Sequence, residues 1–140
     1  MNHKIYLKTN TDINATSEVL SWLEQINQPP FHNQKIWWEL QTLLVEGFIN
    51  IVEHAHKKLP RETPIELEVI RLEEHIEIRI WSLGEPFELE KQLEITSALE
   101  DNDQERGRGL QIMSSIADKL SYKLTDDNRY CLFISRSVEC

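Results

Sequence analysis

The sequence is poor in cysteine, and its cysteines suggest neither a disulfide framework nor a metal site. Cys131 lies in a predicted strand and Cys140 ends the chain, so the two have no ligand spacing. No apolar run approaches the ~18 residues of a membrane span. The N-terminal residues also lack the apolar segment of a signal peptide. We therefore expect a cytoplasmic protein with reduced thiols and no membrane association.

Positive charge is scarce as well. The chain carries 15 Lys plus Arg against 24 Asp plus Glu, a formal net charge of −9. An acidic surface repels phosphate backbones, which argues against direct nucleic-acid binding. A bound nucleotide would have to be held by local groups rather than by a positive field.

The length and composition are those of a single globular domain spanning residues 1–140. Hydrophobic residues make up 40% of the chain and charged residues 28%, as in an ordinary globular protein. A chain of this length buries roughly 68% of its unfolded surface. There is no internal repeat and no low-complexity segment.

Hydrophobic periodicity predicts helices and strands in an α/β protein of the α+β two-layer type. We expect a mixed, mainly antiparallel sheet covered by helices on one face. An irregular helix is expected over 88–99 and a mobile loop over 100–106. Helices are further expected from Asp12 or Asn14 to about Asn27, from Asn33 to about Lys58 and from Gly109 to about Ala117, and strands around residues 5–7, 65–69, 76–80, 120–124 and 130–134.

The second helix carries the most informative residues. Glu46 and Asn50 lie four residues apart at one edge of its apolar face. A carboxylate can act as a general base, and an amide oxygen can bind Mg²⁺ beside nucleotide phosphates. The same pair is also common on a solvated helix edge. Gly47, inside the helix, indicates close packing or the approach of a ligand.

Two histidines follow on the same helix. His54 falls within the apolar face, which favours a hydrogen-bonded structural histidine over a catalytic one. His54 and His56 diverge by ~200° on an α-helix and therefore cannot chelate one metal ion.

A glycine pair, Gly107 and Gly109, is predicted to open the later helix. Backbone N–H groups at a helix start suit phosphate. Arg106 and Arg108 flank the turn and could meet phosphate oxygens. Taken alone, G-x-G is equally consistent with an ordinary loop-to-helix turn, and each arginine with a solvated surface residue.

Together these segments resemble the GHKL ATPase superfamily, and most closely its anti-sigma factor serine kinase branch. The resemblance rests on Glu46-Gly47-Phe48-Ile49-Asn50-Ile51-Val52-Glu53-His54, on Gly84-Glu85-Pro86-Phe87 after a strand, and on Gly107-Arg108-Gly109-Leu110. It covers nearly the whole chain. It implies the Bergerat ATP-binding fold, with ATP and Mg²⁺ as ligands.

The resemblance also implies roles for individual residues. Glu46 would be the general base and Asn50 the Mg²⁺ ligand, while residues 88–106 would form a lid over the nucleotide. Nucleotide contacts are implied for Ser82, Gly84, Arg106, Gly107, Arg108, Gly109 and Leu110. The implied partners are a sigma factor, which such proteins sequester, and an anti-anti-sigma protein of the STAS type, which they phosphorylate on serine. A homodimer is also expected.

One departure from the family pattern concerns the adenine site. The family strand ends in D-x-G, whereas this chain has Ser82-Leu83-Gly84. A neutral hydrogen bond in place of a charge-assisted one would cost ~1 to 2 kcal/mol, about tenfold in affinity. The alternative is therefore a non-catalytic binding module with weak or absent nucleotide binding. The catalytic domain of a sensor histidine kinase fits less well, because we find no dimerisation helix pair with a phospho-accepting histidine.

Overall fold

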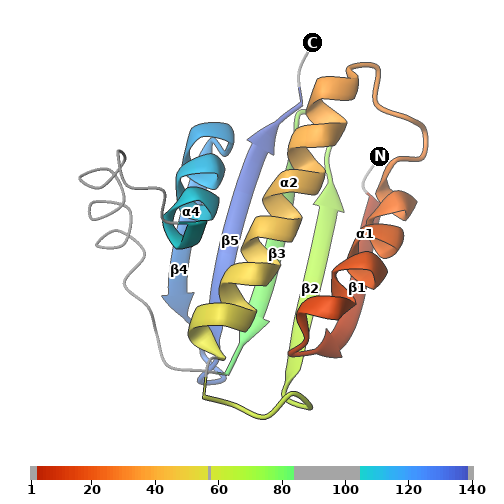
Figure 1. The fold of residues 1–140 in the computed structure, drawn as a ribbon. Helices are drawn as coiled ribbons and strands as arrows, with labels where there is room; N and C mark the ends of the chain where they lie inside the picture. The colour runs from red at the N-terminus through yellow and green to blue at the C-terminus, as the bar shows by residue number, and fades with distance from the viewer. Residues whose placement is uncertain (1–2, 57, 84–104, 139–140) are drawn as a thin grey trace.

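The computed structural model describes residues 3–56, 58–83 and 105–138, and for residues 105–110 the backbone alone. Five strands form one sheet in the order β1-β2-β3-β5-β4 (Figure 1). All four neighbouring pairs are antiparallel. The strands are β1 (His3–Asn10), β2 (Pro64–Arg71), β3 (His75–Ser82), β4 (Lys119–Leu124) and β5 (Tyr130–Ser137).

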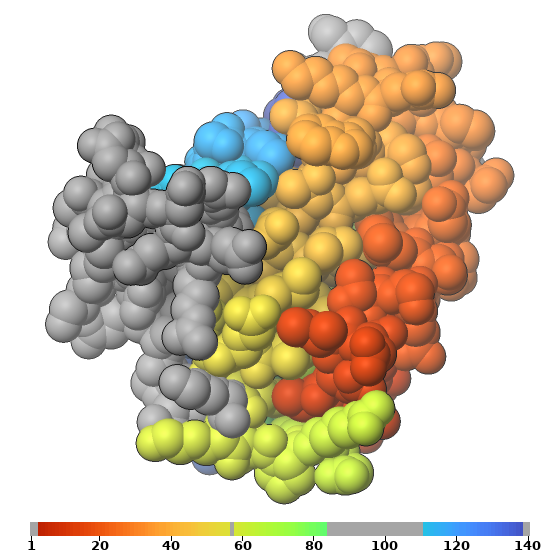
Figure 2. Space-filling model, viewed as in Figure 1, coloured from red at the N-terminus to blue at the C-terminus, as the bar shows by residue number. Residues whose placement is uncertain are grey.

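Three α-helices cover one face of this sheet: α1 (Thr16–Leu23), α2 (Gln34–Asn50) and α4 (Glu105–Ile116) (Figure 1). In the space-filling view from this side, their side chains hide most of the sheet (Figure 2). The α+β two-layer fold expected from the sequence is thus confirmed. The sheet was expected to be mixed and mainly antiparallel, and every strand pair in the described residues is antiparallel.

The strands form where apolar and polar residues alternate. In β2 and β3 the buried positions are every second residue, for example Leu67 and Ile80, which face each other in register. Leu132 and Ile134 of β5 extend the same apolar face. Burying one face under helices fixes the register, because a slip of one residue would expose all these side chains.

The first helical region is less regular than expected. Asp12 does cap it, accepting a hydrogen bond from the Asn14 N–H at 3.0 Å. The expected single helix to Asn27 is replaced by a 3₁₀ turn (Ile13–Ala15), the short α1 and a second 3₁₀ turn (Glu24–Ile26). Val19, Leu23 and Ile26 are nevertheless buried as the apolar pattern predicts.

Helix α2 begins as predicted and ends differently. Asn33 caps it by accepting from the Lys35 N–H at 2.9 Å. The α-helix stops at Asn50, and Ile51–Ala55 form a π-helical turn, so the expected α-helix to Lys58 is wrong at this end. The His56 N–H donates to the Ile51 carbonyl at 2.8 Å, which is the i→i−5 bond of a π turn.

The later helix also differs at its start. It begins at Glu105, so Glu105 and Arg106 are helical and the loop expected over 100–106 is wrong for these two residues. Gly107 and Gly109 therefore lie inside the first turns of α4 rather than before the helix. The helix expected over 88–99 lies outside the described residues.

Gly47 is required by close packing, one of the two explanations open from the sequence. A Cβ at this position would lie 3.0 Å from Ile80 Cδ1 and 3.3 Å from Leu132 Cδ2. The glycine thus lets α2 lie directly on β3 and β5. This packing brings the end of α2, with Glu46 and Asn50, against the end of β3.

We expect Gly47→Val to lower the free energy of unfolding by about 1–3 kcal/mol, because a branched side chain overpacks this contact. Urea denaturation measures the change. Gln41→Val, at a half-buried position of the same helix, is the control and should cost only a few tenths of a kcal/mol in helix propensity. Equal stability of the two variants would contradict the packing role of Gly47.

Candidate functional site

The two predicted site residues of α2 lie on its last turns. Glu46 is half-buried, and Asn50 is 5% exposed. Among the described residues, the Asn50 carboxamide has no hydrogen-bond partner. A buried amide normally has one, so Asn50 is well suited to bind a ligand.

Glu46 has the electrostatic character of a base. Burial raises the pKa of its carboxyl above the ordinary value, and the nearby Glu53 carboxylate raises it further. A higher pKa makes the carboxylate a better proton acceptor near neutral pH. The same shift is consistent with a half-buried carboxylate that has no catalytic role.

Ser82 ends β3 and is fully buried. Its Oγ lies 3.3 Å from the hydroxyl of Tyr122 on β4. Burial raises the pKa of Tyr122, while the Ser82 hydrogen bond lowers it. Ser82 therefore makes a side-chain hydrogen bond to another strand, a contact that no motif in the sequence indicated.

The phosphate-binding segment is described only in part. Gly107, Arg108 and Gly109 lie within α4, as do Arg106 and Leu110. The first four N–H groups of an α-helix lack intrahelical acceptors. The last of these belongs to Gly107 and therefore remains available for an anion, whereas the N–H groups of Arg108 and Gly109 belong to the helix ladder. Gly84, and the predicted lid over 88–106 except for Glu105 and Arg106, lie outside the described residues.

Sequence reasoning missed His56. It is only 1% exposed, whereas an α-helix would direct it away from the apolar face. In the π turn each residue rotates less about the helix axis than in an α-helix. This difference turns His56 inward, and His54 is half-buried instead. No spacing signal in the sequence indicates a π turn here.

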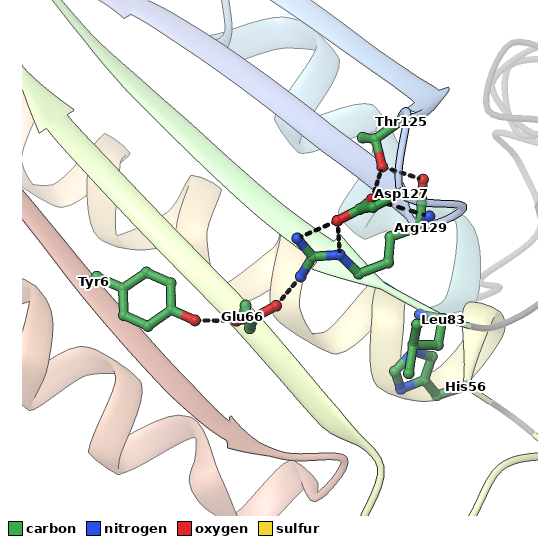
Figure 3. A network of polar contacts seen from close by, with 7 residues as sticks. All are labelled: Tyr6, His56, Glu66, Leu83, Thr125, Asp127 and Arg129. Atoms are coloured by element: carbon green, nitrogen blue, oxygen red, sulfur yellow. Dashed lines mark hydrogen bonds and ion pairs between the residues drawn. The ribbon is translucent and has the colours of Figure 1, made fainter.

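The opposite face of the sheet carries a separate polar network. Arg129 pairs with Glu66 and with Asp127, and Tyr6 donates to Glu66 (Figure 3). The Arg129 guanidinium also lies 5.5 Å from the centre of the Trp81 ring. This network joins the strands on the side away from the helices, so it is distinct from the site formed by α2 and the end of β3.

The described residues contain neither a metal-binding cluster nor a membrane-spanning helix. Within residues 3–56, 58–83 and 105–138, no three His, Cys, Asp or Glu side chains cluster to hold a metal ion. Mg²⁺ that arrives with a nucleotide needs few protein ligands, because it keeps several waters and binds the phosphates. The amide of Asn50, which is buried and has no partner among the described residues, fits this requirement. No helix in the same part of the chain has the length and apolar character to cross a membrane.

A match to a known protein family identifies the domain. The model of the histidine kinase-like ATPase domain matches residues 9–135 of this chain. The chain belongs to the histidine kinase-like ATPase family. This membership confirms the resemblance to the GHKL superfamily drawn from Glu46, Asn50 and the glycine motif. No curated protein sequence matches the chain significantly.

A solved structure shares the fold of this ATPase domain. A chain in the crystal structure of the SiaB–SiaC complex from Pseudomonas aeruginosa aligns with a TM-score of 0.69 at 15% identity. The alignment covers 94% of this chain and 88% of that chain. At this identity the match establishes the fold of the histidine kinase-like ATPase domain, and nothing about its ligands.

Proposed function

We propose that this protein is an ATP-dependent serine kinase of the anti-sigma type. It would phosphorylate a serine of an anti-anti-sigma partner of the STAS type and sequester a sigma factor. The observation that carries the proposal is that Glu46, whose pKa is raised, and the buried Asn50, which has no partner among the described residues, lie on one helix of a histidine kinase-like ATPase domain.

The chemistry assigned to this site needs one base and one orienting ligand. Glu46 takes the proton of the attacking serine hydroxyl, whose oxygen forms a bond to the γ-phosphorus. The bond between that phosphorus and the β,γ-bridging oxygen breaks, and ADP leaves. When Mg²⁺ is bound, it neutralises phosphate charge, and the Asn50 amide oxygen would be its protein ligand. Gly107 would offer its backbone N–H group to the phosphates.

The proposed partners are supported by the structural neighbour. The solved structure with the shared fold is a two-protein complex, SiaB with SiaC. A chain of this fold thus occurs in a complex of two proteins. The acidic surface of the chain, with a net charge of −9, also favours protein partners over nucleic acid. A homodimer and a cytoplasmic location belong to the same proposal.

Nucleotide binding is the first test. Isothermal titration of the protein with ATP and ADP, with Mg²⁺ and then with EDTA, should give Mg²⁺-dependent binding in the micromolar range. Asn50→Ala should weaken binding in Mg²⁺ far more than in EDTA. The control is Asn10→Ala, at an exposed position at the end of β1, and it should bind as the parent does. The absence of binding up to millimolar nucleotide would overturn the proposed kinase.

A specific observation favours a second function, a non-catalytic binding module. Ser82, which stands where the family has Asp, is fully buried and bonded to Tyr122. Its hydroxyl therefore already makes one hydrogen bond within the protein. In this alternative the domain binds its protein partner without nucleotide turnover.

Ser82→Asp discriminates between the two functions. We expect about tenfold tighter ATP binding, because a carboxylate accepts a stronger hydrogen bond from the adenine amine than a hydroxyl does. We also expect a lower melting temperature without ATP, because position 82 is buried and a buried charge is costly. Titration and thermal denaturation with and without ATP measure both effects.

Ser82→Ala is the matched control for this test. It removes the bond to Tyr122 without adding a carboxylate, so it should not tighten ATP binding. If Ser82→Asp binds ATP no better than Ser82→Ala does, the binding module is favoured over the kinase.

A further inference from the structure

His56 joins three separate parts of the chain at the predicted nucleotide end of the domain. Its Nδ1 lies 2.7 Å from the hydroxyl of Thr11, and its Nε2 accepts the backbone N–H of Leu83 at 2.9 Å. The Thr11 hydroxyl also donates to the Thr63 carbonyl at 2.7 Å. Figure 3 shows His56 directly beside Leu83.

These contacts fix the protonation state of the ring. A threonine hydroxyl has one proton, and Thr11 gives it to the Thr63 carbonyl. The oxygen of Thr11 must therefore accept the proton on Nδ1 of His56. Nε2 is then left with a lone pair, which the Leu83 N–H uses. His56 is thus the neutral Nδ1-protonated tautomer with both ring nitrogens satisfied, and burial lowers its pKa in agreement.

The position of this bond connects the two sides of the site. His56 follows the π turn that begins directly after Asn50, the predicted Mg²⁺ ligand. Leu83 stands between Ser82 and Gly84, the two residues predicted to meet adenine. The bond from the Leu83 N–H to His56 therefore holds the end of β3 at a fixed place relative to the end of α2.

We propose that neutral His56 is a positioning residue for nucleotide binding, which it supports by fixing Leu83 and hence the adenine-binding strand end. This inference rests on the proposed function. Protonation would put an N–H on Nε2 facing the N–H of Leu83, so the bond would be lost and a charge buried. The affinity for nucleotide should then fall as the pH drops below the ordinary pKa of a histidine side chain.

The charged groups on the segments packed against His56 are paired elsewhere or exposed. On the segments packed against the ring, Asp12 and Arg61 are paired with each other, with Arg61 Nε 3.0 Å from Asp12 Oδ2. Glu62 is exposed, and so is Glu53 on the same turn as His56. Among the described residues, no carboxylate pairs with His56. Burial alone disfavours its charged form.

Two variants test the proposal. His56→Gln keeps an oxygen that can accept the Leu83 N–H but cannot titrate. His56→Leu keeps apolar bulk and removes the acceptor. We expect His56→Gln to bind ADP with wild-type affinity at pH 7.5. Between pH 7.5 and pH 5.5, the logarithm of its affinity should fall by at most about half as much as that of the wild type. His56→Leu should bind about tenfold more weakly even at pH 7.5, the loss of one hydrogen bond to a buried group.

Isothermal titration with ADP across this pH range gives the affinities. NMR amide exchange reports on Leu83 itself. Its N–H should lose protection in His56→Leu and keep it in His56→Gln, a local change that a general loss of stability would not produce. His32→Gln, which removes an exposed histidine, is the control and should follow the wild-type pH profile. If His56→Leu does not fold, the pH profile of His56→Gln still decides the matter.

The outcomes separate this inference from the proposed function. If the wild type binds ADP and His56→Gln shows the same pH profile, His56 is not a positioning residue, and the kinase proposal stands. If no protein in the series binds nucleotide at any pH, the proposed function fails and the positioning role fails with it.

Discussion

Replacing Glu46 by Gln should reduce phosphate transfer by about 10²–10⁴-fold, the usual contribution of a general base. Gln keeps the shape of the side chain but cannot take the proton of the serine hydroxyl. Because Glu46 is half-buried and makes no ion pair with a described residue, the fold should persist. Transfer of labelled phosphate from ATP to the partner measures the rate, and titration with ATP should show unchanged affinity.

The raised pKa of Glu46 adds a dependence on pH. The base must be deprotonated, so activity should fall as the pH drops through its raised pKa, closer to neutrality than for an ordinary glutamate. Glu53→Gln is the matched control. It removes the carboxylate that helps to raise the pKa of Glu46, and so should retain transfer and move this acidic limit to lower pH. Full activity of Glu46→Gln would show that Glu46 is not the base.

The sheet was predictable because period-2 alternation is a local property of the sequence. Ile65, Leu67 and Val69 are buried on one face of β2, as their alternation predicts. Asn33 was predictable as a helix cap for a similar reason, since it precedes an apolar stripe of helical period. Such features depend on neighbours within a few residues.

The end of α2 depends on tertiary structure instead. The π turn over Ile51–Ala55 keeps the N–H of His56 bonded to Ile51 and places the ring between Thr11 and Leu83. These partners are 45 and 27 residues away in the chain. A single sequence carries no signal that joins them. The tautomer of His56 and its role follow only from that geometry.

A second contact of this kind links α2 to β5. Glu39 is 8% exposed and accepts from Arg136 Nη2 at 2.9 Å, across 97 residues of sequence. Arg136 Nη1 also donates to the Ser137 carbonyl. Its Nε is buried and has no partner among the described residues. The guanidinium is therefore half-buried with incomplete compensation, and Glu39 is the carboxylate that pairs with it.

Arg136→Met should lower the free energy of unfolding by about 3 kcal/mol, because it leaves the Glu39 carboxylate buried and unpaired. Glu39→Leu should cost a similar amount by leaving the arginine unpaired. The double variant should recover most of the lost stability, because the two apolar side chains can pack against each other and leave no unpaired charge. Urea denaturation of the four proteins in this cycle gives the coupling energy.

The control for this cycle is an ion pair of the same protein whose lysine is exposed. Lys4 lies 3.3 Å from Glu68, and its side chain is 62% exposed. Lys4→Met should change stability by no more than about 0.5 kcal/mol, because surface pairs contribute little. If Arg136→Met cost no more than Lys4→Met, the link between α2 and β5 would rest on apolar packing alone. A coupling energy well above 1 kcal/mol would instead show that the pair of Glu39 and Arg136 fixes α2, and with it Glu46 and Asn50, in place on the sheet.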